Sequence, residues 1–336
     1  MKKEKLKSQN IVNILFTCIG RRVSLLESFR KAAKGLRIKA RFLGTDTTRL
    51  SAALQLCDKR FLVKPINDAG YIKQLLSIVE SSKVRLLVPT IDTELKILAQ
   101  NQKKFAKLGC RVLVSSEEVI DICQDKRQTY RFLIKNGFET PITMSAGSAL
   151  SKSNLTWPCL LKPWDGSAGK DIFIVKNRQE LAFYTRKIKN AICQEYIEGE
   201  EYTCDVYVDF EKNVRCAIPR KRLEVRAGEV SKSRIIKNTN IMNQAVKLVE
   251  LLGAGPGVIT LQLFLTKKQK LKFTEINPRF GGGAPLSIRA GANFPKWILQ
   301  EFLGKQPKIE FDDFTDGLIM LRYDSEVWID KQNPKY

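Results

Sequence analysis

Short apolar runs alternate with helical patterns over the first third of the chain. The run VNILFTCIG, at residues 12–20, is rich in strand-forming residues, and apolar residues then recur at helical spacing from Val23 onward. The runs at residues 40–46 and 85–92 repeat the strand pattern, and the helical pattern YIKQLLSIVESS precedes the second of them. This alternation predicts a doubly wound parallel α/β domain, with helices on both faces of its sheet, over residues 1 to about 115.

A helix and a set of antiparallel strands are predicted farther along. The helix covers residues 126–136, with Asp125 placed to cap its first turn and Gly137 to end it. The segments WPCLLKP and DIFIVK then flank a glycine-containing turn, and TCDVYVD alternates apolar and polar residues as a half-buried strand does. Residues 258–265 and 271–277 are two further strands, joined by the lysine-rich turn TKKQK.

The length and composition suit a globular protein built from two or three packed modules. The chain has 336 residues, of which 43% are hydrophobic and 28% charged. No apolar run reaches the roughly 18 residues of a membrane span, so no membrane partner is expected. Arg21 and Arg22 directly follow the first apolar run, which we therefore interpret as a buried strand behind a disordered basic tail, rather than as a signal peptide.

The sequence contains eight cysteines, all of them single, and no histidine. No C-x-x-C pair or imidazole is present to build a zinc site, and we interpret the cysteines as buried thiols of a cytoplasmic protein. Without imidazole, proton transfer falls to carboxylates, lysine, tyrosine, water or the substrate. This composition favours chemistry that depends on phosphate and metal ions.

The charge balance is strongly basic. Lysine and arginine number 58 against 35 acidic residues, a formal net charge of +23, with local excesses at residues 1–39 and 212–237. Such a charge attracts polyanions. The sequence shows neither the aromatic and basic interleaving of RNA-binding proteins nor a short DNA-binding motif, so a nucleic-acid partner is not favoured. An anionic small substrate, or a host with generally basic proteins, explains the charge as well.

Oxygen-bearing side chains occupy matching positions in the last two predicted strands. Alternate residues of a strand share a face, so Glu275 and Asn277 are expected to point the same way as Phe273. If Gln262 on the partner strand points to that side too, Gln262, Glu275 and Asn277 converge. Such oxygen ligands suit Mg²⁺ that is completed by water and phosphate oxygens. A solvated strand face is the alternative interpretation.

The segment LLKPWDGSAGKDI has the composition of a phosphate-binding loop. It places Lys162 at a strand end and Gly166, Ser167 and Gly169 in the turn that follows. Glycines let backbone amides approach phosphate oxygens and a lysine adds a point charge, although the Walker sequence is absent. An ordinary hairpin turn is the alternative.

A short acidic linker, CQEYIEGEEYT, follows in the sequence. It carries Gln194 and Glu195 before Ile197, and Glu201 after Gly199. A linker of this kind can bind an adenine edge through its backbone and a ribose hydroxyl through a carboxylate. Acidic residues around a glycine are equally typical of an ordinary turn.

Taken in order, these segments resemble the ATP-grasp superfamily, in particular its carbamoyl-phosphate-synthase-like branch, which includes the ligase of pyrrolysine biosynthesis. The resemblance covers most of the chain and rests on the order and spacing of five segments. It implies a parallel α/β domain over residues 1–115, followed by two α+β lobes that clasp ATP between them. The small lobe would cover residues 116–195 and carry the phosphate loop, and the large lobe would cover residues 196–336 and carry the metal and catalytic site.

The resemblance also implies roles for individual side chains. It assigns Lys126 and Lys162 to the ATP phosphates, and the turn at Gly166, Ser167 and Gly169 to a mobile flap over them. Arg279 would lie beside the transferred phosphoryl group, which a guanidinium can hold bidentately. It assigns Gln194, Glu195 and Ile197 to adenine and Glu201 to the ribose. The implied metal ligands are Gln262, Glu275 and Asn277.

Two features of the sequence have more than one interpretation. Arg222 and Arg226, in PRKRLEVRAGEVSKS, are further anion-binding candidates, and Arg226 joins Arg279 as a candidate catalytic residue; a solvated basic strand is the alternative. The glycines of TEINPRFGGG either bring the backbone close to a substrate or form a flexible turn. Asp92 and Glu94, after a first-domain strand, are expected to face a substrate amine.

The chemistry that the resemblance implies is ATP-dependent activation of a carboxylate as an acyl-phosphate, followed by attack of an amine to give an amide. The expected cofactors are ATP and one or two Mg²⁺ ions, which Mn²⁺ can replace. The expected partners are a small carboxylate and a small amine, for a monomer or a homodimer. The alternatives are a kinase or carboxylase that uses the same cleft, and a non-catalytic protein that binds nucleotides or polyanions.

Overall fold

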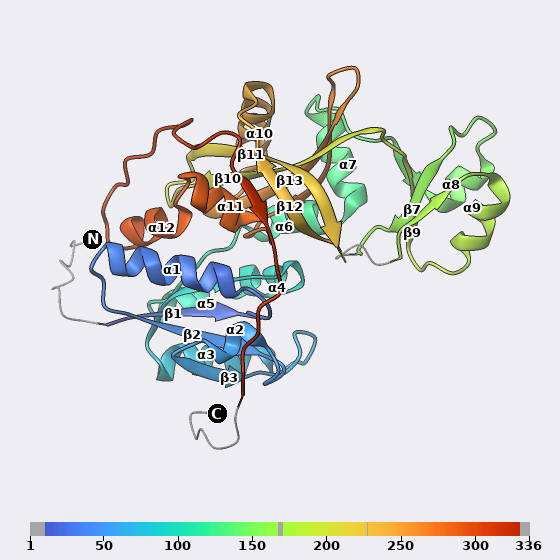
Figure 1. Ribbon diagram of the computed structural model, residues 1–336. Coiled ribbons are helices and arrows are strands. Elements are labelled where there is room, and N and C mark those ends of the chain that lie inside the picture. Colours follow the sequence, from blue (N-terminus) through green and yellow to red (C-terminus); the bar gives the residue numbers. More distant parts are fainter. Residues whose placement is uncertain (1–10, 167–170, 227, 330–336) are drawn as a thin grey trace.

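The computed structural model describes residues 11–166, 171–226 and 228–329, and its strands form three sheets (Figure 1). A parallel sheet lies in the N-terminal part, and two antiparallel sheets with their helices follow it. The predicted fold class, a parallel α/β domain followed by α+β lobes, is confirmed. The basic tail expected before residue 11 lies outside the described residues.

The parallel sheet has the strand order β3-β2-β1-β4-β5. The chain therefore winds outward from β1 to β3, then returns to the centre and winds the other way from β4. Apolar residues are buried on both faces, as the alternating sequence pattern predicts. Its strands and helices are β1 (Val12–Thr17), α1 (Val23–Gly35), β2 (Ala40–Asp46), α2 (Ala52–Gln55), β3 (Lys59–Leu62), α3 (Tyr71–Ser81), β4 (Val84–Pro89), α4 (Asp92–Gln100), α5 (Gln102–Lys107) and β5 (Arg111–Val112).

Two helices, α6 (Glu117–Gln124) and α7 (Lys126–Lys135), connect this domain to the rest of the chain. The predicted cap is present, since the Asp125 carboxylate accepts a hydrogen bond from the Arg127 backbone amide at 2.8 Å. The helix ends at Lys135, and Gly137 adopts a left-handed conformation with φ of 75° just after it.

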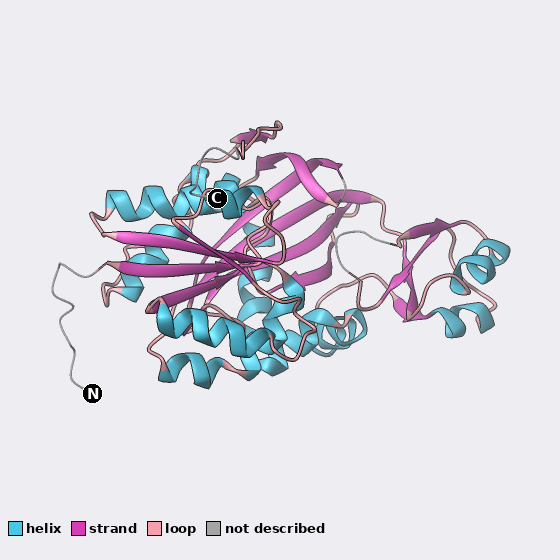
Figure 2. Cartoon of the chain, turned by 90° about the horizontal axis from the view of Figure 1, so that it is seen from below, coloured by secondary structure: helices cyan, strands magenta, loops and turns pink. Residues whose placement is uncertain are grey.

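The small lobe is a four-stranded antiparallel sheet in the order β6-β9-β7-β8, and it projects from the rest of the molecule (Figures 1 and 2). It has a hydrophobic core of its own, built around Cys159, Leu161 and Leu181. Its elements are β6 (Thr143–Ser145), α8 (Ala146–Ser151), β7 (Cys159–Pro163), β8 (Phe173–Val175), α9 (Arg178–Thr185) and β9 (Ala191–Glu195).

The large lobe is a six-stranded antiparallel sheet in the order β14-β13-β10-β11-β12-β15. Its core is continuous with that of the first domain: Phe29 of α1 lies 6.0 Å from Phe280, centroid to centroid. Its elements are β10 (Gly199–Val208), β11 (Val214–Arg226), β12 (Glu229–Ile235), α10 (Thr239–Leu252), β13 (Gly257–Thr266), β14 (Leu271–Asn277), α11 (Ala284–Ala290), α12 (Phe294–Phe302) and β15 (Ile319–Leu321).

Within the described ranges, none of the helices combines the length and the apolar character that crossing a bilayer requires. The three sheets span different parts of the sequence, but the domain boundaries at residues 115 and 195 stay a prediction.

Glu94 is wholly buried inside the first domain. Its carboxylate accepts hydrogen bonds from the hydroxyls of Thr17, at 2.7 Å, and Tyr71. Burial raises the pKa of Glu94 to about 7, although these hydrogen bonds act in the opposite direction. The prediction that Glu94 faces a substrate amine was therefore wrong, because Glu94 lies in the first turn of α4 and its side chain is buried against Thr17 and Tyr71.

We predict that Glu94→Gln removes a pH-dependent loss of stability. The folded-state pKa lies above the ordinary value of 4.5, so the carboxyl favours folding when protonated, and this contribution is lost as pH rises from about 4.5 through about 7. The variant should gain about 2–3 kcal/mol over the parent between pH 5 and pH 8 in the free energy of urea unfolding. Glu80→Gln, at an exposed site on α3, is the control; equal pH profiles for all three proteins would contradict the prediction.

Candidate functional site

Polar side chains form a row across four strands of the large sheet. The register places Gln262 opposite Glu275, and Thr260 opposite Asn277, while Thr203 of β10 lies between Gln262 and Arg220. Cross-strand neighbours share a face, so one face of the sheet carries alternating carboxylates, amides and guanidiniums. These residues are Glu201, Thr203, Asp205, Arg220, Arg222, Thr260, Gln262, Glu275 and Asn277.

A β-bulge sets the direction of Glu275. The register of β13 and β14 shifts between Gln262 and Leu263, so that Leu263 pairs with Phe273. Phe273 is therefore buried in the core, whereas Glu275 and Asn277 are only partly buried, on the opposite face. The expectation that Glu275 and Asn277 share a face with Phe273 was wrong, because strict alternation ignores the extra residue that a bulge inserts.

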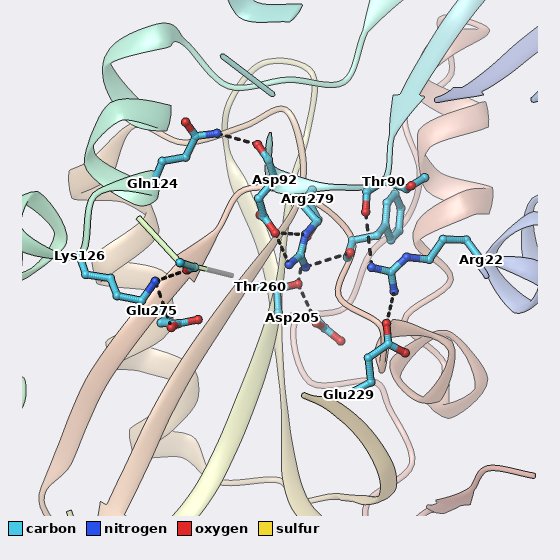
Figure 3. A network of polar contacts seen from close by, with 12 residues as sticks. Arg22, Thr90, Asp92, Gln124, Lys126, Asp205, Glu229, Thr260, Glu275 and Arg279 are labelled. Carbon is cyan, nitrogen blue, oxygen red and sulfur yellow. Dashed lines mark hydrogen bonds and ion pairs between the residues drawn. The ribbon is translucent and has the colours of Figure 1, made fainter. Parts of the chain in front are cut away.

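Two lysines approach Glu275 from the side of the small lobe. Lys126, at the start of α7, places its Nζ 3.6 Å from Glu275 Oε1 and donates to the Gly166 carbonyl at 2.5 Å (Figure 3). Lys162, on β7, is almost wholly buried. Burial lowers the pKa of Lys162; Glu275 opposes this effect and Lys126 adds to it. The two ammonium groups and the carboxylate thus form one interacting cluster between the lobes.

The structure describes only the start of the predicted phosphate loop. Gly166 lies at its start and holds Lys126 through its carbonyl oxygen. The predicted flap residues Ser167 and Gly169 lie outside the described residues.

Two of the three predicted adenine residues, Gln194 and Glu195, form hydrogen bonds to other side chains of the protein. Gln194 is buried and its amide donates to the Thr143 hydroxyl at 2.9 Å. Glu195 accepts from Lys272 Nζ at 2.6 and 2.8 Å and from the backbone amide of residue 142 at 3.1 Å. Ile197 is half-buried in the linker between β9 and β10. The side chains of Gln194 and Glu195 are therefore already engaged by protein partners.

The predicted ribose residue, Glu201, is paired with Arg222. Arg222 Nη1 donates to Glu201, and Gln262 Oε1 lies 3.4 Å from the same nitrogen. Burial raises the pKa of Glu201; Arg222 opposes this effect and Glu275 adds to it. The predicted ribose and metal residues therefore belong to one electrostatic system.

The two predicted catalytic arginines lie in different environments. Arg279 binds the Asp92 carboxylate, with Nε and Nη2 at 3.0 and 2.6 Å from Oδ2 (Figure 3). Arg226, at the end of β11, is 71% exposed and pairs with its neighbour Glu224. The structure brings Arg279, but not Arg226, into the polar network.

A buried ion pair between β10 and β11, which was not singled out in the sequence, lies in the same row of polar side chains. Arg220 donates to both carboxylate oxygens of Asp205, at 2.8 and 3.0 Å, and both residues are almost fully buried. Thr260 and Ser287 also donate to Asp205, at 3.2 and 2.7 Å. The available signal was Asp205 within the apolar run TCDVYVD, because a charge in a buried strand requires a partner.

The glycine triplet packs against this pair. A Cβ on Gly283 would lie 2.1 Å from Arg220 Nη1, and one on Gly281 would lie 2.9 Å from the Thr260 side chain. A Cβ on Gly282 would likewise lie 3.0 Å from Nη1 of Arg22 in the first domain. The triplet is therefore neither a simple flexible turn nor free backbone, since each glycine allows a close approach between segments.

The donor set fits a hard cation beside an anion. Asn277 Nδ2 and Arg222 Nε are buried and, among the described residues, have no hydrogen-bond partner. Glu275 supplies one carboxylate, with amide oxygens available from Gln262 and Asn277. Over the same part of the chain, no three His, Cys, Asp or Glu side chains gather closely enough to bind a metal alone. A metal here would therefore need oxygen ligands from a bound nucleotide or water.

Comparison with family models divides the chain into two parts. Residues 14–113 match the model of the PylC-like N-terminal domain, and residues 123–283 match that of the ATP-grasp domain. A carbamoyl-phosphate synthase of Methanobrevibacter smithii is 23% identical over 256 residues, which cover 71% of this chain and 67% of that protein. A D-alanine–D-alanine ligase of Fusobacterium nucleatum is 24% identical over 178 residues, which cover 50% of this chain and 59% of that protein.

Comparison with solved structures supports the same fold. The biotin carboxylase domain of the Hydrogenobacter thermophilus 2-oxoglutarate carboxylase, in complex with MgADP, ADP and bicarbonate, has a TM-score of 0.71. The similarity covers 91% of this chain and 73% of that chain, at 16% sequence identity. At this identity the likeness concerns the fold.

We predict that Gly283→Ala destabilises the protein strongly. The added methyl group would occupy the position of the Arg220 guanidinium and separate it from Asp205, which leaves a buried charge unpaired. We expect a loss of about 3–5 kcal/mol in the free energy of urea unfolding. Gly35→Ala is the matched control, because nothing lies within 4 Å of the added carbon, and it should change stability by less than about 1 kcal/mol. Similar stability of both variants would contradict the role of the pair.

Proposed function

Since the chain belongs to the ATP-grasp family, in its carbamoyl-phosphate-synthase-like branch, and is an ATP-dependent ligase, we propose that it joins a carboxylate to an amine. A carboxylate oxygen attacks the γ-phosphorus of ATP, which gives an acyl-phosphate and ADP. The amine nitrogen then attacks the acyl carbon and loses a proton, and phosphate leaves with the oxygen that was activated. The products are one amide, one ADP and one phosphate.

The observation that carries this proposal is the cluster of Lys126, Lys162 and Glu275 between the two lobes. Lys126 lowers the pKa of the buried Lys162, and two ammonium groups placed in this way are costly unless an anion shares the site. Glu275 supplies only one negative charge, so the cluster retains an excess positive charge. A polyphosphate, with a cation on its other side, matches this arrangement.

In this proposal Lys126 and Lys162 bind phosphate oxygens, and Glu275, Asn277 and Gln262 hold Mg²⁺. The ion, when bound, neutralises phosphate oxygens and orients the triphosphate. ATP with Mg²⁺ is what the family uses. A second Mg²⁺, or Mn²⁺ in its place, is a further part of the proposal.

The nucleoside would lie along the linker that joins the lobes. The backbone around Ile197 would contact adenine, because the Gln194 and Glu195 side chains are engaged elsewhere, and Glu201 would accept from a ribose hydroxyl. The flap at Gly166, Ser167 and Gly169 would cover the phosphates. In this arrangement the small lobe, 116–195, and the large lobe, 196–336, close on the nucleotide, and the domain 1–115 adjoins the substrates.

Arg279 is the proposed phosphoryl-binding residue. Its guanidinium is held in place by Asp92 and lies beside the strand that carries Glu275 and Asn277. Moving one hydrogen bond from Asp92 to an incoming phosphoryl oxygen requires little rearrangement, so the group is already oriented for the transition state. A catalytic role of Arg226 would require its exposed side chain to leave Glu224. The proposed partners are a small carboxylate and a small amine. The protein would act as a monomer or a homodimer.

We predict that Glu275→Ala abolishes Mg²⁺-dependent ATP turnover while leaving the fold intact. Loss of the carboxylate removes the charged ligand of the proposed metal site, so kcat/KM should fall at least about 100-fold. ADP release and the melting temperature are measured together. Glu198→Ala, at a side chain that is 73% exposed, should retain activity, and unchanged turnover in Glu275→Ala would remove the metal assignment.

We also predict that ¹⁸O from the substrate carboxylate appears in the released phosphate. The acyl-phosphate route moves one carboxylate oxygen to phosphate when the amine attacks, whereas a kinase leaves the phosphoryl group on its product. A screen of ADP release over pairs of carboxylic acids and amines identifies the substrates, and mass spectrometry of the phosphate measures the label. Unlabelled phosphate alongside an amide product would exclude the acyl-phosphate.

A further inference from the structure

Two cysteines of the small lobe face each other across neighbouring strands. Cys159 begins β7 and Cys193 lies within β9, and these strands are antiparallel neighbours (Figure 1). The register pairs Leu161 with Cys193, two positions along β7 from Cys159, so the sulfur atoms meet along a diagonal of the ladder. Cys193 Sγ donates a hydrogen bond to Cys159 Sγ at 3.2 Å. The contact thus joins two thiols that are 34 positions apart in the chain.

Both sulfur atoms lie in the apolar core of the small lobe. Cys159 and Cys193 are 1% and 2% exposed, and they belong to the same cluster as Leu161, Val175 and Leu181. Packing alone would be satisfied by two small apolar side chains, since a buried thiol behaves as a small hydrophobic group. The contact between the sulfur atoms, rather than their burial, therefore distinguishes this pair.

A second pair of buried cysteines shows that burial on neighbouring strands does not by itself bring two thiols together. Cys204 lies on β10 and Cys216 on β11, and they are 0% and 1% exposed. Cys216 pairs with Tyr207, three positions along β10 from Cys204. An odd number of positions places the two side chains on opposite faces of the sheet. The approach of Cys159 to Cys193 is therefore a specific feature of the small lobe.

The hydrogen bond changes the acidity of the two thiols in opposite directions. It lowers the pKa of Cys193, although burial opposes this effect, and it raises the pKa of Cys159, where burial adds to it. Burial instead raises the pKa of both Cys204 and Cys216. The small-lobe pair therefore favours one thiolate, at Cys193, held by the thiol of Cys159. The thiolate is the form of cysteine that reacts with oxidants.

The cysteine pair adjoins a residue of the candidate site. Lys162 pairs with Ile192 in the same ladder, next to the pair of Leu161 and Cys193. Lys162 is 5% exposed, so its ammonium group follows the backbone of β7 and has little freedom to adjust. A covalent bond between β7 and β9 at this point would draw the two strands together. It would thereby displace the Lys162 ammonium group relative to Glu275 on the large lobe.

We propose that hydrogen peroxide converts Cys159 and Cys193 into a reversible disulfide, and that this crosslink weakens nucleotide binding by displacing Lys162. A small oxidant suits the site, because a bulky disulfide reagent would have to enter a packed core. The small lobe has a core of its own, which can open locally while the rest of the molecule stays folded. The effect on the nucleotide rests on the proposed function, whereas the crosslink does not.

The oxidation has two steps. The Cys193 thiolate attacks one oxygen of hydrogen peroxide, which breaks the O–O bond, forms a sulfenic acid and releases hydroxide. The Cys159 sulfur then attacks the sulfenic sulfur, forms the S–S bond and releases the second oxygen as water. Overall the protein loses two hydrogen atoms and hydrogen peroxide becomes two water molecules. A dithiol reductant reverses the change and itself becomes a disulfide.

The experiment detects the crosslink separately from its effect. The full chain is reduced, treated with hydrogen peroxide and mapped by mass spectrometry of unreduced peptides. A crosslink between Cys159 and Cys193 should form, and dithiothreitol should remove it. Calorimetric titration with MgADP should show at least about 10-fold weaker binding to the oxidised protein, because a charge-assisted hydrogen bond from Lys162 is lost. The affinity should return after reduction.

Substitution of one cysteine separates this pair from the others. Cys159→Ala should form no crosslink, and after peroxide treatment it should bind MgADP as tightly as the reduced parent does. Cys193→Ala serves the same purpose if the first variant does not fold. Cys216→Ala is the matched control, because Cys216 is also 1% exposed and lies on a strand of the large sheet. This control should form the crosslink and lose affinity as the parent does.

Three results would overturn the inference. Peroxide treatment that leaves Cys159 and Cys193 without a crosslink rejects the disulfide. A crosslinked protein that binds MgADP as tightly as the reduced protein rejects its effect on the nucleotide. A loss of affinity that also occurs in Cys159→Ala assigns the effect to another sulfur atom. If the reduced parent itself does not bind MgADP, the proposed nucleotide site fails and the effect on binding fails with it, while mass spectrometry still decides the crosslink.

Discussion

The buried ion pair between Arg220 and Asp205 is the constraint on which the rest of the site depends. Two charges in a dry sheet are stable only with good geometry and additional hydrogen bonds, and Thr260 and Ser287 supply these. The pair thereby fixes β10, β11, β13 and α11 relative to one another. The glycine triplet must pass beside it, which sets the path of the chain from Asn277 through Arg279 to the first domain.

The two sides of the proposed nucleotide site are attached differently. The first domain and the large lobe share one apolar core, so their relative position is firmly determined. The small lobe has a separate core and meets the large lobe partly through polar contacts, such as Lys272 with Glu195. Polar contacts between lobes re-form more easily than a shared apolar core, which suits a site that must admit and release ATP.

Local sequence patterns predicted the helices and strands. The directions and partners of individual side chains depend on long-range pairing, which these patterns do not contain. The parallel domain, the Asp125 cap and the hairpin of β13 and β14 follow from spacing within short segments, and the structure has them. The bulge beside Gln262 does not follow, because it depends on how two strands fit together, and it decides which way Glu275 points. Likewise, Asp205 finds Arg220 across a strand pair, and Glu94 turns inward to Tyr71 of another helix, so sequence proximity gave no guide to either partner.

Four cations of the candidate site are each matched with a carboxylate: Lys126 with Glu275, Arg222 with Glu201, Arg279 with Asp92 and Arg22 with Glu229. At these four side chains an incoming anion exchanges partners rather than meeting a free charge, and the net gain per contact is modest. The advantage lies in orientation, because side chains held by carboxylates lose little freedom when a ligand arrives. Selectivity should then be greatest where the existing pair is weakest. By distance that place is Arg22, whose contact with Glu229 is the longest of the four.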